Sequence, residues 1–370
     1  MNDAHTILIS PLDWGLGHAT RCVPIINHLI NAGHNIIIMA SGPSALLLKS
    51  LFPQLEHIEM PEMKIRYSRK RWMFRFVALC QWPKFNRLIK LEKKRINEIL
   101  LTHAVDVIIS DNRFGLFHSG VPSVFITHQL RIKTGLGNFF DNIMQTINYR
   151  KINRFTECWI PDLPGKNNIA GELSHPFKKP EIPIRYIGLQ SRVKITEGIQ
   201  QDDAILVLLS GPEPQRSMLE SIINNQLSSY SGSVTVVRGL PQGGTEIEKW
   251  PGIKYYNYLS GNELNDEFSK AEFIICRSGY SSVMDFLLAG KKTICIPTPG
   301  QTEQEYLGSL LGKKQMAICA EQDNFSLLDS LVKAKQLETN IPPLKENIDF
   351  SKMVNDLVRL FKQGEKKSPA

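Results

Sequence analysis

The sequence predicts an α/β protein with two doubly wound, Rossmann-like domains. Short apolar runs alternate with amphipathic stretches along most of the 370 residues, which indicates parallel strands joined by helices. Two such series follow each other, separated by a polar segment at residues 189–203. A chain of this length exceeds what one compact core usually covers, so two domains are expected.

The first series occupies residues 1–188. A helix is predicted after the first strand because its apolar residues recur at helical spacing, and it ends at Ala32-Gly33. A segment rich in Gly, Pro, Lys and Asn at residues 165–183 precedes the polar linker. The predicted strands of this domain are Ile7–Ser10, Ile36–Ala40, Val105–Ser110, Ser123–Thr127 and Cys158–Pro161.

The second series occupies residues 204–345. Residues 346–370 are predicted as a C-terminal helix and tail, because Val354, Leu357 and Phe361 fall on one helical face. The predicted strands of the second domain are Ala204–Ser210, Ser233–Arg238, Ile253–Tyr256, Phe273–Cys276, Thr293–Pro297 and Ala317–Cys319.

Composition excludes several classes of protein. The six cysteines are dispersed and form no C-x-x-C pair, which argues against a metal cluster or a redox motif. The first residues lack the basic and apolar regions of a signal peptide. No stretch approaches the roughly 18 uninterrupted apolar residues of a membrane span. We therefore expect a cytoplasmic protein.

The loop after the first predicted strand contains Gly15 and Gly17, which let a ligand approach the backbone closely. It lacks the full fingerprint of nicotinamide enzymes, because Thr20 stands where the third glycine is expected. The second strand ends in Ala40-Ser41-Gly42 and supplies no acid for a ribose. The sequence therefore argues against a nicotinamide cofactor.

The stretch 277–285 follows a predicted strand and opens a predicted helix. Gly279 permits a sharp turn there, and Ser281 and Ser282 can open the helix. The start of a helix offers free N–H groups and the positive end of a dipole to an anion. Asp285, one turn further, is placed to accept hydrogen bonds from a sugar diol. The stretch outlines a nucleotide-diphosphate site, with an ordinary βα turn as the alternative.

Three stretches together resemble the two-domain GT-B glycosyltransferases, most closely the MurG-type and UDP-glycosyltransferase groups. They are Gly15–Arg21, Arg277–Gly279 and Gln301–Glu305. The resemblance covers nearly the whole chain in order and spacing. It implies two Rossmann-like domains facing a central cleft and an inverting sugar transfer from a nucleotide donor, usually UDP-linked. The donor would lie mainly on the second domain and the acceptor mainly on the first.

The resemblance also implies donor-site residues. The loop with Gly211 and Arg216 matches one that approaches the phosphates, with an exposed turn and a surface arginine as the alternative. Leu264 matches a position that reads uracil or, alternatively, packs in the core. Gln304 and Glu305 match positions that hold sugar hydroxyls, with a solvated helix start as the alternative. The full donor set is Gly211, Arg216, Leu264, Arg277, Ser278, Gly279, Tyr280, Ser281, Ser282, Asp285, Gln301, Gln304 and Glu305.

His18 is the candidate general base, because a histidine that titrates near neutrality can remove the proton of an attacking hydroxyl. A helix cap or a structural histidine is the alternative. Asp111, at another strand end, can orient His18 or act as the base itself. For Asp111 and His128, acceptor binding and catalysis are both open. The acceptor set is Asp13, Gly15, Gly17 and His128.

No metal ion and no cofactor beyond the nucleotide-sugar co-substrate are expected. The chain lacks a D-x-D triplet. The dipole of the helix after Gly279 and the charge of Arg277 can instead stabilise a diphosphate leaving group. A metal-independent inverting mechanism is therefore predicted.

Residues 64–95 are strongly basic. They hold twelve Lys or Arg and one acid, Glu92. The net charge of this segment is therefore more positive than the +8 of the whole chain. Aromatic residues are interleaved with the basic ones. This pattern favours an anionic membrane surface over nucleic acid, which is not expected as a partner. A solvated helix face with its aromatics in the core is the remaining interpretation.

The sequence is thus interpreted as a glycosyltransferase of the hexosyltransferase type, acting on a glycan, lipid or other hydroxyl acceptor, peripherally at the inner face of a membrane. A non-hydrolysing UDP-sugar 2-epimerase shares the architecture but needs no separate acceptor, so the G-x-G-H loop and the basic segment count against it. A non-catalytic nucleotide-sugar-binding protein is the third interpretation.

Overall fold

The computed structural model describes residues 4–60, 82–241, 243, 250–339, 341–342, 344 and 348–365. The chain divides into two compact units. Among the described residues, unit 1 comprises the chain up to Gln190 together with residues 348–365, and unit 2 begins at Ser191 and ends with residue 344.

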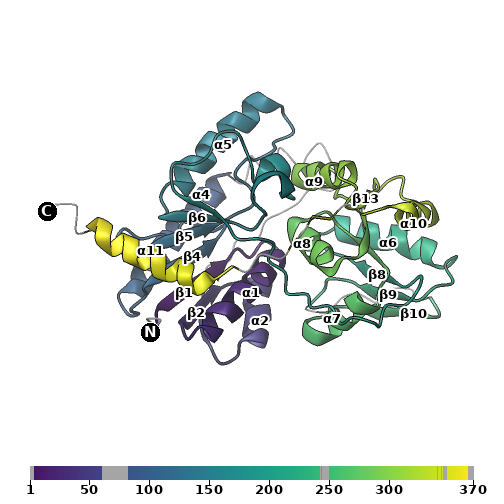
Figure 1. Cartoon of the computed structure of the whole chain (residues 1–370), viewed down its shortest axis with the longest axis horizontal. Helices are drawn as coiled ribbons and strands as arrows, with labels where there is room; N and C mark the ends of the chain where they lie inside the picture. The colour runs from purple at the N-terminus through teal and green to yellow at the C-terminus, as the bar shows by residue number, and fades with distance from the viewer. Residues whose placement is uncertain are drawn as a thin grey trace. The chain divides into compact units, whose positions relative to one another are not determined.

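Unit 1 is built on a parallel sheet of seven strands in the order β3-β2-β1-β4-β5-β6-β7 (Figure 1). The central strands read as continuous apolar runs because both faces of the sheet are covered. The strands are β1 (Thr6–Pro11), β2 (Asn35–Ala40), β3 (Glu56–Glu59), β4 (Val107–Asp111), β5 (Ser123–Ile126), β6 (Glu157–Ile160) and β7 (Ile184–Tyr186).

The helices of unit 1 include one that returns from the far end of the chain. Phe350, the first residue of that helix, packs against Trp159 of β6 with ring centres 5.7 Å apart and ring planes tilted by 43°. Ser351 Oγ lies 2.9 Å from His34 Nε2. The helices are α1 (Gly17–Asn31), α2 (Gly42–Leu51), α4 (Trp82–Leu100), α5 (Asn138–Ile152) and α11 (Phe350–Glu365), with short 3₁₀ turns at Gly165–Asn167 and Gly171–Leu173.

Unit 2 repeats the same architecture with six parallel strands in the order β10-β9-β8-β11-β12-β13. The strands are β8 (Ile205–Leu208), β9 (Val234–Val237), β10 (Ile253–Tyr256), β11 (Phe273–Cys276), β12 (Lys292–Cys295) and β13 (Ile318–Cys319). The helices are α6 (Gln215–Leu227), α7 (Gly261–Lys270), α8 (Tyr280–Ala289), α9 (Thr302–Lys313) and α10 (Leu327–Gln336).

Both sheets reverse their strand order at one point, between β1 and β4 in unit 1 and between β8 and β11 in unit 2. Connections leave the sheet in opposite directions on the two sides of such a point. The carboxyl ends of the strands there are the usual ligand sites of open α/β sheets. Ligand sites are therefore expected at the loops after these four strands.

The predicted fold class is confirmed, and each predicted strand occurs within two residues at either end. The sequence missed β3 and β7, which lie at the two edges of the first sheet. Edge strands are covered less completely, so β3 (Glu56–Glu59) has exposed acids at both ends and β7 (Ile184–Tyr186) is only three residues long. The stretch 191–203 packs on unit 2, where Thr196 N donates to Ser269 Oγ.

Candidate active site

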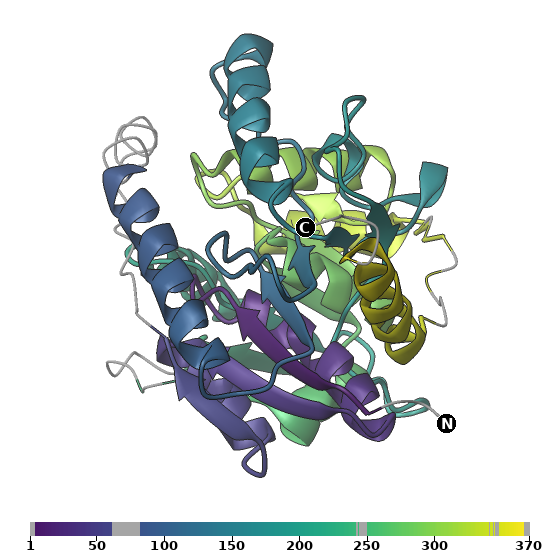
Figure 2. The ribbon, with the colours of Figure 1, turned by 90° about the vertical axis from the view of Figure 1, so that its left-hand side faces the viewer.

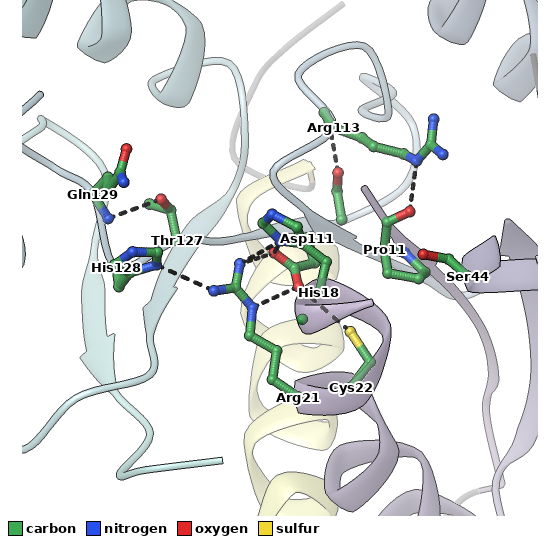
Figure 3. A network of polar contacts seen from close by, with 12 residues as sticks. Pro11, His18, Arg21, Cys22, Ser44, Asp111, Arg113, Thr127, His128 and Gln129 are labelled. Atoms are coloured by element: carbon green, nitrogen blue, oxygen red, sulfur yellow. Dashed lines mark hydrogen bonds and ion pairs between the residues drawn. The ribbon is translucent and has the colours of Figure 1, made fainter. Parts of the chain in front are cut away.

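The first candidate site lies at the strand-order reversal of unit 1. His18, Arg21 and Cys22 follow β1 on the first two turns of α1, and their spacing of three and four residues brings them to one helix face. Asp111 is the last residue of β4, the strand paired with β1. Figure 3 shows these side chains converging, with His128 approaching from the loop after β5.

Asp111 is the centre of this network. It is fully buried and accepts hydrogen bonds from Arg21 Nε at 2.6 Å, from Arg21 Nη2, and from the Cys22 thiol at 3.7 Å. Its Oδ1 is also 3.2 Å from His18 Nδ1. Burial alone would raise the pKa of Asp111, but the Arg21 charge and the hydrogen bonds outweigh it and hold the pKa well below its usual range. Asp111 is therefore a carboxylate.

His18 is a neutral base candidate. Burial lowers the pKa of His18 below 6.5, the Asp111 charge opposes this, and the Arg21 charge adds to it. The ring keeps 18% of its side-chain surface exposed. When the proton of the ring is on Nδ1 and is shared with Asp111, Nε2 is left with a lone pair that can accept a proton.

The structure brings His128 into the same network, although not through direct contact with Asp111. Its Nδ1 lies 3.1 Å from Arg21 Nη1, and the side chain is buried. The pairing joins α1 to the loop after β5. The predicted residues His18, Asp111 and His128 are thus held together by Arg21, which the sequence analysis quoted in a motif without giving it a role.

Asp13, predicted to bind the acceptor, has partners inside unit 1. Its side chain is buried and accepts a hydrogen bond from Ser41 Oγ at 2.7 Å, while Oδ1 lies 3.9 Å from Arg113 Nη2. Arg113 is in turn paired with Glu92 at 3.1 Å. The carboxylate therefore belongs to a buried ion-pair network that no local pattern revealed. In the same loop, Gly15 has a φ of +91° and faces open space.

The second candidate site is formed by the loops after β8, β11 and β12 in unit 2. Gly211 has a φ of +99°, and a Cβ there would lie 3.8 Å from Thr298 Oγ1. Gln304 Oε1 accepts from Thr298 N at 2.8 Å, and Ser278 Oγ donates to the carbonyl of Gln304 at 2.8 Å. Gly279 precedes α8, and a Cβ on it would lie 3.8 Å from the Gln304 amide. We call these five residues the unit 2 cradle.

Two features make the cradle suited to an anion. Within the described parts of the chain, the buried Thr298 Oγ1 has no hydrogen-bond partner, although buried hydroxyls are normally paired. The first turn of α8 carries no acidic residue, and its N-cap residue Gly279 has no side chain. The dipole of the helix start can therefore act on a ligand. Thr298 was missed by the sequence analysis, although it follows a predicted strand.

The two predicted donor-site arginines form hydrogen bonds and ion pairs within unit 2. Arg277 is almost fully buried, where its guanidinium donates to the carbonyls of Ile296 and Gln215 at 3.1 and 2.7 Å. Burial lowers the pKa of Arg277 to about 10. Arg216 is paired with Glu213 and Glu220 at 2.6 and 3.1 Å. Arg277 thus joins loops that are distant in the sequence, whereas Arg216 pairs with acids three and four residues away. Direct contact of either cation with a phosphate stays a prediction.

Asp285 lies one turn into α8 and is partly buried. Its Oδ1 accepts a hydrogen bond from Ser191 Oγ. Burial raises the pKa of Asp285 to about 6, against the hydrogen bond and the Arg192 charge. The carboxyl group therefore titrates close to neutral pH.

The other predicted donor residues divide between core and surface. Leu264 is 5% exposed, so its side chain belongs to the core, and Tyr280 is also buried. Glu305 Oε1 accepts from Gly300 N at 2.9 Å and closes the turn before α9, which begins after Gln301. Ser281 and Ser282 lie half-buried on the first turn of α8.

A further surface of unit 1 combines basic and apolar side chains. Figure 2 looks onto this unit and shows α4 in blue and α5 in teal. The two helices meet where Lys151 Nζ of α5 lies 4.5 Å from the ring centre of Phe85 on α4. The exposed basic residues of α4 are Lys84, Arg87, Lys90 and Lys94, and the exposed apolar residues at the start of α5 are Leu136, Phe139, Phe140 and Ile143. We call this set the α4–α5 surface.

The described residues contain neither a helix suited to span a membrane nor a cluster of metal-ligating side chains. None of their helices is long and apolar enough to cross a membrane. No group of three or more His, Cys, Asp or Glu side chains in the same residues is arranged to hold a metal ion.

The chain is similar to known glycosyltransferases. Residues 236–358 match the glycosyltransferase family 28 C-terminal domain. A UDP-N-acetylglucosamine--N-acetylmuramyl-(pentapeptide) pyrophosphoryl-undecaprenol N-acetylglucosamine transferase from Sulfurihydrogenibium sp. (strain YO3AOP1) is 24% identical over 167 residues. That alignment covers 42% of this chain and 47% of the relative, so the chain matches about half the length of this curated relative.

Solved structures show the same architecture over almost the whole chain. The glycotransferase of kitacinnamycin has a TM-score of 0.64 at 12% identity, with complete coverage of both chains. Arabidopsis thaliana UGT89C1, complexed with UDP-L-rhamnose, has a TM-score of 0.58 at 12% identity, covering 99% of this chain and 95% of that chain. The chain therefore has the two-domain GT-B fold, and the predicted resemblance to MurG-type glycosyltransferases is confirmed.

Proposed function

We propose that this protein is an inverting glycosyltransferase that moves a sugar from a UDP-linked donor to a hydroxyl acceptor without a metal ion. The observation that carries the proposal is the neutral His18 held against the ionised Asp111 at the strand-order reversal of unit 1. The unit 2 cradle supplies a second argument, because it suits a diphosphate. The name of the curated relative specifies a UDP-linked donor and an undecaprenol-linked acceptor.

In the proposed reaction, His18 Nε2 takes the proton of the acceptor hydroxyl as its oxygen attacks the anomeric carbon. Asp111 stabilises the imidazolium that forms, through the Nδ1 contact of 3.2 Å. The bond from the anomeric carbon to UDP breaks with its electron pair staying on the diphosphate oxygen. A single displacement of this kind inverts the anomeric configuration.

The leaving UDP needs stabilisation of its developing charge. In the proposal, the positive end of the α8 dipole faces the diphosphate and the Thr298 hydroxyl donates to it. Gly211 and Gly279 keep side chains out of the cradle. Asp285 accepts from the ribose hydroxyls. Arg277 acts indirectly, because it ties the loop after β12 to the start of α6.

We further propose that the protein works peripherally on the cytoplasmic face of an anionic membrane, on a lipid-linked acceptor. Residues 64–81 of the predicted basic segment lie outside the described residues. The α4–α5 surface supports the proposal, since exposed cations attract anionic headgroups and exposed aromatic side chains can enter the interface.

The test is turnover of labelled UDP-sugars by the full chain, with a membrane lipid extract, a soluble extract or no acceptor. We expect UDP release that depends on the lipid extract, persists in EDTA, is lost in His18→Ala, and gives a product of inverted configuration by NMR. Conversion of the donor sugar without any acceptor would instead identify an epimerase. UDP binding without turnover in every arm would leave a binding protein.

A further inference from the structure

We propose that Arg21 is a positioning residue for this chemistry: it clamps Asp111 against His18 and fixes the proton of His128 on Nε2. The inference rests on the proposed function, in which His18 is the base. Arg21 is 2% exposed and lies one turn after His18 on α1, in the middle of the network in Figure 3.

The clamp consists of two hydrogen bonds from one guanidinium edge to one carboxylate. Arg21 Nε donates to Asp111 Oδ2 at 2.6 Å, and Nη2 donates to Oδ1. Such a forked pair fixes the plane of the carboxylate, because rotation of Asp111 would break both bonds. Oδ1 therefore stays directed at His18 Nδ1, 3.2 Å away. A lysine at position 21 could supply charge but not this two-point geometry.

The contact with His128 fixes a tautomer. A guanidinium can only donate hydrogen bonds, and Arg21 Nη1 lies 3.1 Å from His128 Nδ1. His128 Nδ1 must therefore accept, which leaves the proton of the neutral ring on Nε2. In that tautomer the only lone pair on the ring is the one that faces Arg21. At His18, Nδ1 faces both Arg21 Nη2 at 2.9 Å and the Asp111 carboxylate at 3.2 Å, and only an Nδ1 proton shared with Asp111 leaves Nε2 basic, as the proposed function requires.

Arg21 also influences the charge of His18. Its Nη2 lies 2.9 Å from His18 Nδ1, so a cation and the Asp111 carboxylate approach the same ring nitrogen. Burial lowers the pKa of His18 most, the Asp111 charge raises it, and the Arg21 charge lowers it again. Without the Arg21 charge, we expect the pKa of His18 to rise and more of the base to be protonated at neutral pH.

NMR on the full chain labelled with ¹⁵N-histidine, without substrate, tests this directly. Signals of His18 and His128 are assigned by substituting each residue in turn. We expect the Nε2–H tautomer for His128 in the wild type. Arg21→Gln should raise the pKa of His18 and give His128 a mixture of tautomers. Arg21→Lys should also release the His128 tautomer but keep the pKa of His18 closer to that of the wild type, because it keeps the charge.

Arg113→Lys is the matched control, because Arg113 is a buried arginine of the same unit that pairs with Glu92. It should lower the melting temperature without moving either histidine signal. If Arg21→Gln does not fold, Arg21→Lys and the wild type decide. A wild-type His128 protonated on Nδ1, or folded Arg21 variants with unchanged histidine signals, would overturn the proposal.

The activity arm separates this inference from the proposed function. Arg21→Lys should lower kcat at least about tenfold, the low end of what misplacing a general base costs, while leaving KM for the donor unchanged. Absence of turnover with every donor and acceptor would refute the proposed function. The histidine tautomer and pKa would still decide the role of Arg21, since neither measurement needs a substrate.

Discussion

At the scale of single residues, the partners of a buried carboxyl group decide the pH range in which it titrates. Asp111 is fully buried yet ionised, because Arg21 faces it with two donors. The hydrogen bond and the Arg192 charge near Asp285 do not outweigh its burial, and its pKa rises to about 6. Two carboxylates of one chain thus titrate in different pH ranges. Asp111 is therefore suited to be a permanently charged partner of a base, and Asp285 is suited to be a ligand contact that titrates.

His18→Ala should leave UDP affinity unchanged and reduce transfer by about 10²-fold or more, the usual contribution of a general base. UDP affinity should persist because the unit 2 cradle contains none of the residues around His18. Steady-state kinetics and calorimetry measure the two effects. His118→Ala is the control, since His118 lies in a loop of the same unit and, among the described residues, bonds only to neighbouring backbone. Turnover of His18→Ala at the wild-type rate would move the base to Asp111.

The wild-type affinity for UDP should increase as the pH rises through about 6, where Asp285 loses its proton and becomes the better acceptor for ribose hydroxyls. Asp285→Asn should bind more weakly and lose this part of the pH dependence. Calorimetry of the wild type and of Asp285→Asn between about pH 5 and 7.5 isolates the contribution of Asp285 to the pH dependence. The phosphate groups of UDP titrate near the same pH with both proteins, so their contribution is common to the two curves. Parallel pH curves would show that Asp285 does not contact the nucleotide.

At the scale of elements, each candidate site is a helix start placed beside a strand-order reversal. α1 follows β1 and α8 follows β11, and in both cases glycine precedes or opens the helix. The glycines have different roles. Gly211 has a left-handed φ that other residues rarely adopt, whereas Gly279 has an ordinary φ of −70°, and a Cβ on it would make only an ordinary 3.8 Å contact with the Gln304 amide.

Gly279→Val should therefore fold normally and bind UDP at least about tenfold more weakly, a loss of about 1.4 kcal/mol. The Cβ of the valine would make an ordinary contact of 3.8 Å with the Gln304 amide. We expect its two methyl groups to occupy space in the cradle that the diphosphate needs. Melting temperature and calorimetry measure the two effects. Gly312→Ala is the control, because its Cβ would make an ordinary 3.7 Å contact with Cys319. Unchanged UDP affinity in Gly279→Val would exclude the cradle as the diphosphate site.

At the scale of the whole molecule, the chain forms two units whose boundaries do not follow the order of the sequence. The C-terminal helix α11 belongs to unit 1, where Phe350 packs on Trp159 and Ser351 on His34. The region that matches the family 28 domain extends into this helix. Unit 1 also carries the α4–α5 surface, so the proposed membrane contact and the proposed base lie on the same unit.

The full chain should co-sediment with anionic vesicles and lose this binding steeply as salt rises, because each basic residue near the surface contributes roughly 1 kcal/mol. Phe139→Ser with Phe140→Ser should weaken the binding that persists at high salt. Replacing Lys84, Arg87 and Lys90 with Glu should remove the salt-sensitive part. Both variants should bind UDP normally.

The matched control for this experiment replaces Leu328 and Val332 with Ser. These residues are similarly exposed, but they lie on α10 of unit 2. Vesicle binding that falls equally in the control and in the Phe139/Phe140 variant would refute the α4–α5 surface as the contact. A soluble acceptor would then be the better hypothesis.

The sequence by itself determined the fold class, most of the strands and the position of His18. Buried parallel strands are apolar on both faces, so they can be read locally as apolar runs between helical periods, and only the edge strands escape. Helix starts that contain glycine can likewise be recognised from the local sequence. The two candidate sites could therefore be located from the chain alone, at the loops that follow β1 and β11.

Only the tertiary structure decided which charged groups face a ligand and which face each other. Asp111 and His128 lie 90 and 107 residues from Arg21, and no periodicity predicts that pairing. The same holds for Asp13 and Arg277, whose partners Ser41 and Ile296 are distant in the sequence. A buried charge is tolerated only with a partner, and that partner is set by strand order and not by the local sequence.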